Sequence, residues 1–392
     1  MLSAGNRDFS LPAARLAAAV AAVSCLAGCG GAEKGGHSSA QKPSRGQLFN
    51  ATETNCLRGD LAQCLLIEDR LEEPKGFDAD FSKASLLLQD ACREDRSKGD
   101  SCARLGLSWR FGIGASRDNA KATDILSTTC KAGNMTACAW WGDLYAHGLG
   151  GTRDSSLAIK LYTMACDKNE PRGCTGLGRA YSDGAGVAVS TAKAMDLFTK
   201  ACDSAYGPAC ARLGDLYERG HGVERERQRA LREFERGCEA NSSVACLVMS
   251  VVHRYGMGRT QDPDQSLEYA AKACMYGHAT ACSELSEWNE SGEMCDIDPR
   301  KALSYLDKAC QLGAGPACLA MGEACARGEM KHCTPEYETL YFTRSCGNGV
   351  PQACTRAGEA YDKGRGVSVD KDKASNFFKK ACDGGDSFGC KR

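Results

Sequence analysis

The sequence predicts an all-α solenoid, a linear stack of helix–turn–helix repeats whose turns are clipped by disulfides. Three observations support this prediction. Cysteine pairs with C-x7-C spacing return every 36 residues over most of the chain. Glycine, alanine and aromatic residues recur in columns at the same period, and apolar residues inside each repeat have helical spacing. A fixed period of this size indicates a stacked-repeat architecture, in which each unit contacts only its neighbours.

Residues 208–239 show how one repeat is built. Apolar residues recur at helical spacing in two segments: Ala209, Leu213, Leu216 and Tyr217, then Ala230, Leu231 and Phe234. Pro208 suits the first turn of a helix, and Gly220 suits a helix end. We therefore expect a first helix, a short turn and a second helix, with the next first helix beginning near Val244.

Three columns describe the packing between helices. Small residues share one position in the first helix: Gly106, Gly142, Gly178, Gly214, Ser250, Ser286, Gly322 and Gly358. Alanines form a column in the second helix (Ala122, Ala158, Ala194, Ala230, Ala302 and Ala374), and Trp109, Tyr145, Tyr181, Tyr217 and Tyr361 form an aromatic one. Because glycine inside a helix costs roughly 1 kcal/mol relative to alanine, its recurrence predicts close helix–helix approach.

Gly-x-Gly follows the first helix in several repeats, as in Gly184-Ala185-Gly186. Such loops cradle phosphates when a strand precedes them, but here a helix precedes each one. We interpret these residues as turn glycines with positive φ.

The cysteines occupy the other turn, between the second helix of one repeat and the first helix of the next. The expected disulfides are Cys56–Cys64, Cys92–Cys102, Cys130–Cys138, Cys166–Cys174, Cys202–Cys210, Cys238–Cys246, Cys274–Cys282, Cys310–Cys318, Cys346–Cys354 and Cys382–Cys390. Only the Cys92–Cys102 turn differs, with two extra residues. Structural zinc sites need closer cysteine spacing, so disulfides are favoured over a metal. Each clip should contribute about 2.5 kcal/mol in the chain-entropy model.

Three cysteines lie outside this register. Cys325 and Cys333 are again eight residues apart and are expected to form an extra local bridge. Cys295, in the corresponding loop one repeat earlier, is the alternative partner for Cys333. One of the three is left over, and Cys295 is the candidate free thiol.

Composition excludes some functions and indicates a compartment. The 392 residues carry 49 basic and 50 acidic side chains, which excludes a nucleic-acid binder driven by electrostatics. Twenty-five cysteines at regular spacing indicate an oxidising compartment. The sequence suggests neither a cofactor nor a metal site.

The N-terminal segment has the features of an export signal. Residues 1–28 contain an apolar run preceded by arginines, typical of a signal peptide. Leu26-Ala27-Gly28-Cys29 resembles a bacterial lipobox, which implies lipidation of Cys29; ordinary cleavage with Cys29 as a free thiol is the alternative. We expect a flexible tether over residues 29–50 and an array of about nine repeats over residues 51–392. In a Gram-negative host this implies an exported outer-membrane lipoprotein, periplasmic or surface-facing, held by lipid alone.

The columns resemble a known family. A-x-x-L-G-x-x-Y-x-x-G-x-G-V, followed by a second-helix A-x-x-x-F-x-x-A/G-C, resembles the Sel-one-like repeat, a relative of the tetratricopeptide repeat. The C-x7-C clip is similar to that of the Helicobacter cysteine-rich protein family. The resemblance implies a right-handed α/α superhelix and a role in protein–protein interaction. It also implies an alternative, penicillin binding with weak β-lactamase activity.

The residues themselves give little support for an enzyme. Ser190 and Lys193 match S-x-x-K, but no S-D-N or K-T-G accompanies them. His147 and His221 have no ligand partner nearby in sequence, and His253 stands in the aromatic column as a packed histidine. We therefore assign no catalytic residue.

Two positions of the first helix vary freely between repeats, two and five residues after the second cysteine. Candidate binding residues from these positions are Arg104, Trp140, Asp143, Arg179, Arg212, Asp215 and Arg356. In related solenoids the first helices line the concave surface, where peptide-like partners lie. We expect a protein or peptide partner there, or a cell-wall component, although solvent exposure alone would give the same variation.

Overall fold

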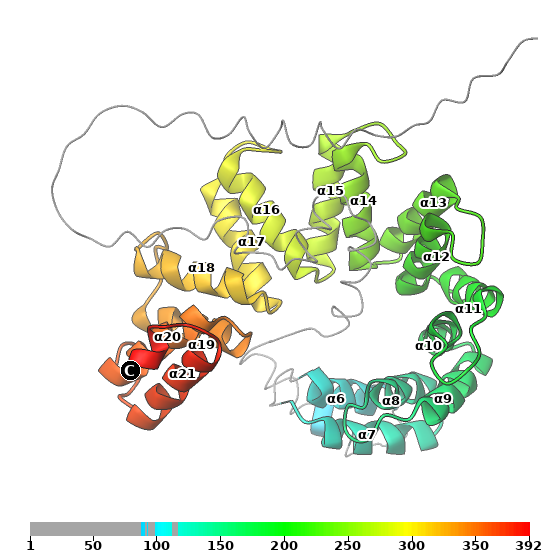
Figure 1. Cartoon of the computed structure of the whole chain (residues 1–392), viewed down its shortest axis with the longest axis horizontal. Coiled ribbons are helices and arrows are strands. Elements are labelled where there is room, and N and C mark those ends of the chain that lie inside the picture. Colours follow the sequence, from blue (N-terminus) through cyan, green and yellow to red (C-terminus); the bar gives the residue numbers. More distant parts are fainter. Residues whose placement is uncertain (1–87, 91, 93–98, 112–116) are drawn as a thin grey trace, which may run out of the picture. The chain divides into compact units, whose positions relative to one another are not determined.

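The computed structural model describes residues 88–90, 92, 99–111 and 117–392. These residues form helices and contain no strand (Figure 1). The helices are α6 (Gly99–Phe111), α7 (Asn119–Lys131), α8 (Met135–His147), α9 (Ser155–Asp167), α10 (Pro171–Asp183), α11 (Thr191–Asp203), α12 (Gly207–Arg219), α13 (Arg227–Glu239), α14 (Ser243–Tyr255), α15 (Pro263–Met275), α16 (Ala279–Ser291), α17 (Pro299–Gln311), α18 (Gly315–Ala326), α19 (Pro335–Gly347), α20 (Pro351–Lys363), α21 (Lys371–Asp383) and the short η2 (Gly389–Lys391). None of the helices in this part of the chain has the length and apolar character needed to cross a bilayer.

Several predictions concern residues outside this range. They are the signal peptide over residues 1–28, the lipidation of Cys29, the tether over residues 29–50, the Cys56–Cys64 bridge and the first repeat of the array. All of these lie outside the residues that the structure describes.

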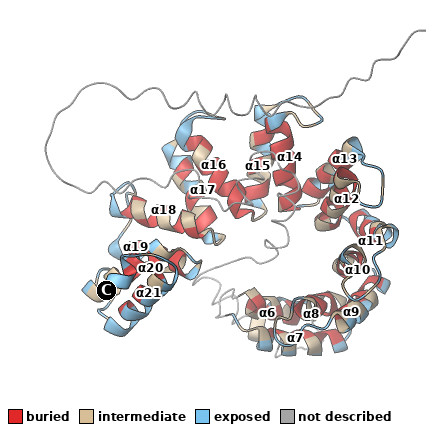
Figure 2. Cartoon of the chain, viewed as in Figure 1, coloured by how far each residue is buried: buried red, intermediate tan, exposed pale blue. Residues whose placement is uncertain are grey.

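Helices alternate between two roles, as the repeat predicts. Each even-numbered helix is the first helix of a repeat and packs along the odd-numbered second helix that follows it. It also packs along the second helix of the preceding repeat, and we call this contact a joint. Figure 2 shows buried residues along the hairpins from α6 to α21. The largest core cluster is shared by consecutive hairpins from Cys166 to Tyr341, and smaller clusters lie in the hairpins towards each end.

The glycine column gives close packing inside each hairpin, as predicted. In six repeats a Cβ added to this glycine would meet a large side chain of the second helix: Leu126, Tyr162, Phe198, Phe234, Phe342 and Phe378. In the other two repeats the position holds Ser250 and Ser286, whose hydroxyls donate to the carbonyl oxygens of Ser266 and Ala302 at 2.9 and 2.8 Å. The facing residues there are the smaller Ala270 and Leu306. A leucine thus faces both Gly106 and Ser286, whereas the aromatic partners face glycine alone.

The loop glycines have the predicted backbone conformation. Gly220 caps α12 with φ 68°, and Gly222 follows with φ 70°. A Cβ on Gly222 would lie 2.8 Å from the Cβ of Thr191, the first residue of α11. The second loop glycine has no Cβ, so the loop can pack closely against the first residue of the preceding second helix. The corresponding loop at Gly112-Ile113-Gly114 lies outside the described residues.

The turn from a second helix to the next first helix carries the disulfides. Cys202, in the last turn of α11, is bridged to Cys210 in the first turn of α12, with 4.8 Å between their Cα atoms. The other bridges of this type are Cys92–Cys102, Cys130–Cys138, Cys166–Cys174, Cys238–Cys246, Cys274–Cys282, Cys310–Cys318, Cys346–Cys354 and Cys382–Cys390. The bridges connect adjacent repeats, as the spacing predicts.

The extra cysteines separate into a pair and a single thiol. Cys325, near the end of α18, is bridged to Cys333 in the following loop, with a Cα separation of 5.5 Å. Cys295, in the loop after α16, is a free cysteine and is partly buried. The alternative bridge between Cys295 and Cys333 is therefore not formed.

Candidate functional site

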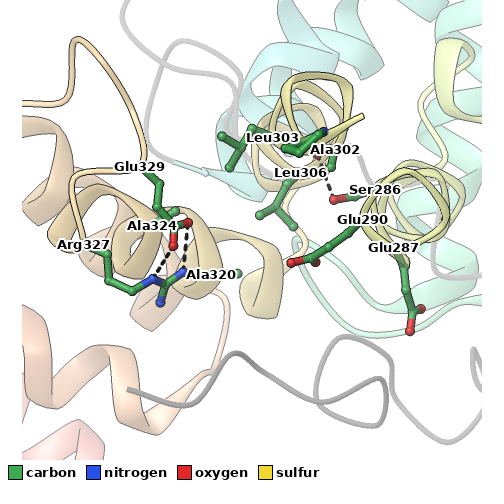
Figure 3. A pocket seen from close by; sticks show the side chains of 11 residues that line it. Ser286, Glu287, Glu290, Ala302, Leu303, Leu306, Ala320, Ala324, Arg327 and Glu329 are labelled. Carbon is green, nitrogen blue, oxygen red and sulfur yellow. Dashed lines mark hydrogen bonds and ion pairs between the residues drawn. The ribbon is translucent and has the colours of Figure 1, made fainter. Parts of the chain in front are cut away.

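A pocket of about 250 Å³ opens at the joint between α17 and α18 (Figure 3). Its apolar floor comes from α17 and α18, whereas its carboxylates come from α16 and from the loop after α18. The lining residues are Ser286, Glu287, Glu290, Pro299, Ala302, Leu303, Leu306, Ala320, Ala324, Arg327 and Glu329. We call this the α17/α18 pocket.

A second pocket, of about 230 Å³, lies at the joint between α9 and α10. It is more polar, and its lining includes Arg153, Arg179 and Asp183. The other lining residues are Ala146, His147, Ser155, Ala158, Ile159, Tyr162, Gly176, Ala180 and Ala185. We call this the α9/α10 pocket.

The two pockets occupy the same place in the repeat. Ala158 corresponds to Ala302 and Gly176 to Ala320, each pair separated by 144 residues, which is four periods of 36. Most of the other lining residues also correspond, for example Ile159 with Leu303 and Tyr162 with Leu306. The two pockets therefore form at equivalent positions of the repeat, at the joint between a second helix and the next first helix.

Side-chain size on the first helix explains where these two pockets form. Two positions, one turn apart, face the joint, and both are small where the pockets lie: Gly176 with Ala180, and Ala320 with Ala324. At the other described joints at least one of the two residues is larger, as in the pairs Trp140 and Leu144, Arg212 and Leu216, Val248 and Val252, Glu284 and Trp288, and Arg356 and Ala360. The first member of each pair belongs to a column predicted to vary. Both pockets therefore coincide with a small residue in that column.

The joint after the α17/α18 pocket carries an ion pair. Glu338 of α19 stands where Ala302 stands in α17, and its carboxylate forms an ion pair with the guanidinium of Arg365 at 2.9 Å. Burial raises the pKa of Glu338, and the positive charges of Arg365 and Arg356 oppose this shift. An ion pair between the buried Glu338 and the largely exposed Arg365 therefore lies at this joint.

Charge distinguishes the α17/α18 pocket from its counterpart. Three glutamates, Glu287, Glu290 and Glu329, line it together with one arginine. Arg327 donates two hydrogen bonds to Glu329, at 2.8 and 3.2 Å. The lining thus has an apolar floor and a net negative rim.

A buried polar network lies beside the α9/α10 pocket. Asp143 accepts from the hydroxyl of Tyr162 at 2.7 Å and from Nε of Arg172 at 2.9 Å. The Arg172 guanidinium lies 3.1 Å from the centre of the Trp140 ring. Burial favours the neutral form of Asp143, but Arg172 and the Tyr162 hydroxyl outweigh this and lower its pKa. Burial and the nearby Asp143 charge raise the pKa of Tyr162.

This network contains two residues of the predicted binding surface, Asp143 and Trp140. Asp143 is buried in an ion pair, so it is a packing residue rather than an open contact. Trp140 is half-buried beneath Arg172. Arg179, by contrast, lines the α9/α10 pocket as a binding residue would.

The remaining predicted residues lie apart from the two pockets. Arg104 and Arg356 are exposed, and Arg212 is half-buried. Asp215 forms an ion pair with Arg219, and burial raises its pKa while Arg219 opposes the shift. The structure does not bring these four residues together into one site.

Other members of the variable columns are buried. Val248 and Val251 are inaccessible on α14, and Glu284 on α16 binds Arg254 of the preceding repeat. Arg254 also lies over the ring of Trp288, 5.1 Å from its centre. The columns therefore vary for packing reasons in the middle of the array, which sequence variation alone does not reveal.

The S-x-x-K match has a structural explanation. Ser190 is the N-cap of α11, and its hydroxyl accepts from the backbone N–H of Lys193 at 3.5 Å. The Lys193 ammonium lies over the ring of Tyr181, 5.0 Å from its centre. The pattern is thus a helix cap followed by a cation–π contact.

His253, His147 and His221 lie in three different settings. His253 is buried and stacks on Tyr269 with 5.4 Å between ring centres, as expected of a packed histidine. His147 ends α8 and lines the α9/α10 pocket, and His221 lies in the loop after α12. Within the described part of the chain, no cluster of three or more His, Cys, Asp or Glu side chains could hold a metal ion.

Comparison with protein families finds a match over most of the helical array. Seven segments match the Sel1 repeat family: residues 99–134, 136–170, 171–206, 207–242, 243–278, 279–313 and 351–386. Together they cover more than half of the chain. Residues 314–350 fall between two matches; they contain the Cys325–Cys333 bridge and Glu338.

A solved structure of a Sel1 repeat protein gives the same fold. A Sel1 repeat protein from Oxalobacter formigenes is 22% identical over 90% of this chain and 97% of its own, with a TM-score of 0.51. Cysteine rich protein B of Helicobacter pylori is 26% identical over 33% of this chain and 94% of its own, with a TM-score of 0.26. At these values only the first carries an argument, and that argument concerns the fold. No curated protein sequence matches the chain.

Proposed function

Because the chain belongs to the Sel1 repeat family, we propose that it is a scaffold that binds a protein partner through the exposed surface of its first helices. Sel1 repeat proteins generally bind other proteins. Repeat solenoids offer extended surfaces built from equivalent positions of successive units. On this proposal the partner lies on the concave face formed by the first helices.

One observation carries the proposal. The two pockets open at equivalent joints, where a variable position of the first helix holds the small residues Gly176 and Ala320. The columns that build the core stay nearly constant, whereas the pocket rims change from basic and polar at α9/α10 to acidic at α17/α18. A constant frame with site-specific rims suits recognition of one extended partner at several points.

The compartment follows from the cysteines. The disulfides connecting adjacent repeats indicate an oxidising, exported environment. We further propose that residues 1–28 are a lipoprotein signal peptide, that Cys29 carries the lipid and that residues 29–50 tether the array to the outer membrane. A cell-wall component is a further candidate partner in that location.

Crosslinking in the native envelope tests the scaffold proposal. The full-length protein would carry a photo-crosslinker at Arg179, in the α9/α10 pocket, and in parallel at the exposed Lys379 of α21 as the control. We expect one defined protein adduct from Arg179, identified by mass spectrometry and absent from the control. Equal adducts from both positions, or none from either, would contradict a specific partner.

An enzymatic role is the alternative, and the geometry does not favour it. The residues of the S-x-x-K pattern serve as a helix cap and a cation–π partner. Penicillin binding or β-lactam hydrolysis would have to come from a different set of side chains.

A further inference from the structure

The loops inside the hairpins are closed by one recurring backbone hydrogen bond. In the α10/α11 hairpin, the N–H of Ser190, the N-cap of α11, donates to the carbonyl oxygen of Tyr181 in the aromatic column at 2.9 Å. This bond ties the end of the first helix to the start of the second. Every other described hairpin except α18/α19 has the equivalent bond, at 2.8–3.0 Å: Asp118 to Trp109, Asp154 to Tyr145, Glu226 to Tyr217, Asp262 to His253, Asp298 to Asn289 and Asp370 to Tyr361.

The α18/α19 hairpin is closed differently. Its equivalent residues are Cys325 and Thr334, the N-cap of α19, and no backbone hydrogen bond joins these two described residues. Thr334 has ψ 164°, whereas the N-cap residues of the other described second helices have ψ between 78° and 98°. Its side chain does not cap α19. We call residues 327–334 the α18–α19 loop.

The Cys325–Cys333 bridge stands where that hydrogen bond is missing. Cys325 occupies the aromatic column, and Cys333 directly precedes the N-cap Thr334. The disulfide thus joins the two ends of the loop, which a backbone hydrogen bond joins in the other hairpins. It lies inside one hairpin, whereas the other described bridges connect adjacent repeats. A bond that reduction can break therefore replaces one that reduction leaves intact.

Access to the sulfur atoms also separates this bridge from those that hold the repeats together. Both cysteines are buried at every inter-repeat bridge from Cys130–Cys138 to Cys346–Cys354. Cys333, by contrast, is partly exposed. The bridges nearest the ends of the described array, Cys92–Cys102 and Cys382–Cys390, also have a cysteine that is not buried. Because thiol–disulfide exchange needs access to one sulfur, a reductant can reach Cys333 while the helices stay folded.

We propose that Cys325–Cys333 is a site of thiol–disulfide exchange, at which a dithiol reductant opens the α18–α19 loop and leaves the stack of repeats intact. One thiolate of the reductant attacks Sγ of Cys333, the S–S bond breaks, and Cys325 leaves as a thiolate that takes up a proton. The second thiolate of the reductant attacks the mixed disulfide and releases Cys333, which is protonated in turn. The bridge gains two electrons and two protons, and the dithiol becomes a disulfide.

Opening the bridge frees one wall of the α17/α18 pocket. Arg327 and Glu329 line the pocket and lie between the bridged cysteines. Without the bridge, neither the backbone bond of the other hairpins nor a side-chain cap from Thr334 holds the start of α19, so the loop gains freedom. The bridged form keeps the wall in place. This inference goes beyond the scaffold proposal and does not depend on the identity of a partner.

Graded reduction of the folded full chain tests the access to this bridge. Cys295 would first be blocked with one alkylating agent. Dithiothreitol would then be added in steps, and the released thiols would be trapped with an isotopically distinct agent and mapped by mass spectrometry. We expect Cys325 and Cys333 to be labelled at least tenfold faster than Cys202 and Cys210, which form a buried inter-repeat bridge. Equal rates, or faster reduction of the buried bridge, would overturn the proposal.

Limited digestion with trypsin tests the release of the loop. Arg327 and Lys331 are exposed cleavage sites between the bridged cysteines. Lys363, at the end of α20, is the matched exposed site beside a loop that the backbone bond closes. After selective reduction we expect cleavage at Arg327 or Lys331 to accelerate at least tenfold, with cleavage at Lys363 unchanged. Unchanged cleavage in the α18–α19 loop would show that the bridge does not hold it and would refute the proposal.

Two variants separate this bridge from other reducible ones. Cys325→Tyr/Cys333→Val copies Tyr181 and Val189 of the α10/α11 hairpin, which is closed without a disulfide. Its α18–α19 loop should be cleaved at the same rate with and without dithiothreitol. Cys325→Ser/Cys333→Ser should be cleaved like the reduced wild-type protein under both conditions. Acceleration by dithiothreitol in either variant would assign the response to another bridge and overturn the proposal.

Discussion

Gly178 of α10 lies directly against the ring of Phe198 of α11. A Cβ added to Gly178 would lie 2.6 Å from Cε1 of Phe198, closer than real side chains approach. Phe198 is 1% exposed, so its ring has little room to move away. This contact sets the distance between the two helices of the hairpin, and a ring meets the glycine in the same way at Gly142, Gly214, Gly322 and Gly358.

Gly178→Ala should destabilise the protein although alanine is the better helix former. The helix gains roughly 1 kcal/mol from alanine, but overpacking of a rigid core costs about 1–3 kcal/mol. We expect a net loss of about 1–2 kcal/mol, measured as a lower urea midpoint. The control is Gly347→Ala in α19, where an added Cβ meets nothing within 4 Å and should be neutral or stabilising.

The same contact can be tested by compensation. The repeat with Ser286 faces Leu306 instead of an aromatic ring, so Gly178→Ser/Phe198→Leu copies a pair the chain already uses. We expect the double variant to be at least about 1 kcal/mol more stable than the sum of its single changes. Additive effects would show that the two residues do not determine each other.

The architecture could be predicted from the sequence because the residues that determine the packing recur every 36 residues. The glycine column predicted close approach, and the structure identifies the partner ring. The pockets were not predicted, since they depend on two small residues one turn apart, such as Ala320 and Ala324, facing an alanine of the previous helix. The small residues are visible in the variable column of the sequence. Their role becomes clear only once the structure shows that this column faces the second helix of the preceding repeat.

The burial of individual side chains in the variable columns could not be predicted from the sequence either. Asp143 and Arg179 both belong to the same variable column, yet the structure buries one in an ion pair and places the other in a pocket. Their difference comes from partners in neighbouring repeats, Arg172 for Asp143, and no single-repeat pattern reveals such contacts.

Ala205→Gly should stabilise the turn between α11 and α12. Ala205 has φ 57°, and the equivalent position is glycine in repeats that contain Gly133, Gly277 or Gly349. A left-handed conformation costs an L-residue about 1–2 kcal/mol, and glycine avoids this cost. Glycine also makes the unfolded chain more flexible, which lowers the free energy of unfolding by about 0.4–1 kcal/mol. We expect a net gain of roughly 0.5–1 kcal/mol in urea unfolding. A loss of stability would contradict the backbone argument.

Removing one inter-repeat disulfide should lower the free energy of unfolding by a defined amount. Cys202→Ser/Cys210→Ser opens the bridge between α11 and α12, and the chain-entropy model gives a loss of about 2.5 kcal/mol. Local proteolysis of the turn should accelerate by more than tenfold, while distant turns keep their protection. Cys295→Ser is the matched control, because Cys295 is outside any bridge and its change should leave both readouts unaltered.

Ser190→Ala separates the structural role of this residue from an enzymatic one. Loss of the N-cap of α11 should lower stability by about 0.5–1 kcal/mol. We expect no turnover of a chromogenic cephalosporin by the wild-type protein or by the variant. Turnover by the wild-type protein that disappears in Ser190→Ala would revive the enzymatic alternative.

His278 should make the protein sensitive to mild acid. It is the N-cap of α16, where its Nδ1 accepts from the backbone N–H of Ala281 at 3.3 Å. The side chain is inaccessible, and burial lowers its pKa to about 3. Because the folded pKa is below the ordinary value of about 6.5, the unfolded chain binds the proton first. Stability is therefore full above pH 6.5 and falls as the pH drops towards 3.

The replacement His278→Asn isolates this effect. Asparagine is the N-cap at the equivalent Asn134, where it accepts from the backbone N–H of Ala137 at 2.8 Å, so the cap survives without a titrating group. Between pH 7.5 and pH 5 the wild-type protein should lose about 2 kcal/mol more than the variant, measured from urea midpoints at both values. The exposed His332, changed to asparagine, is the control and should leave the pH dependence unaltered. An equal loss in wild type and His278→Asn would show that other groups dominate the acid response, since the predicted difference comes from this one buried imidazole.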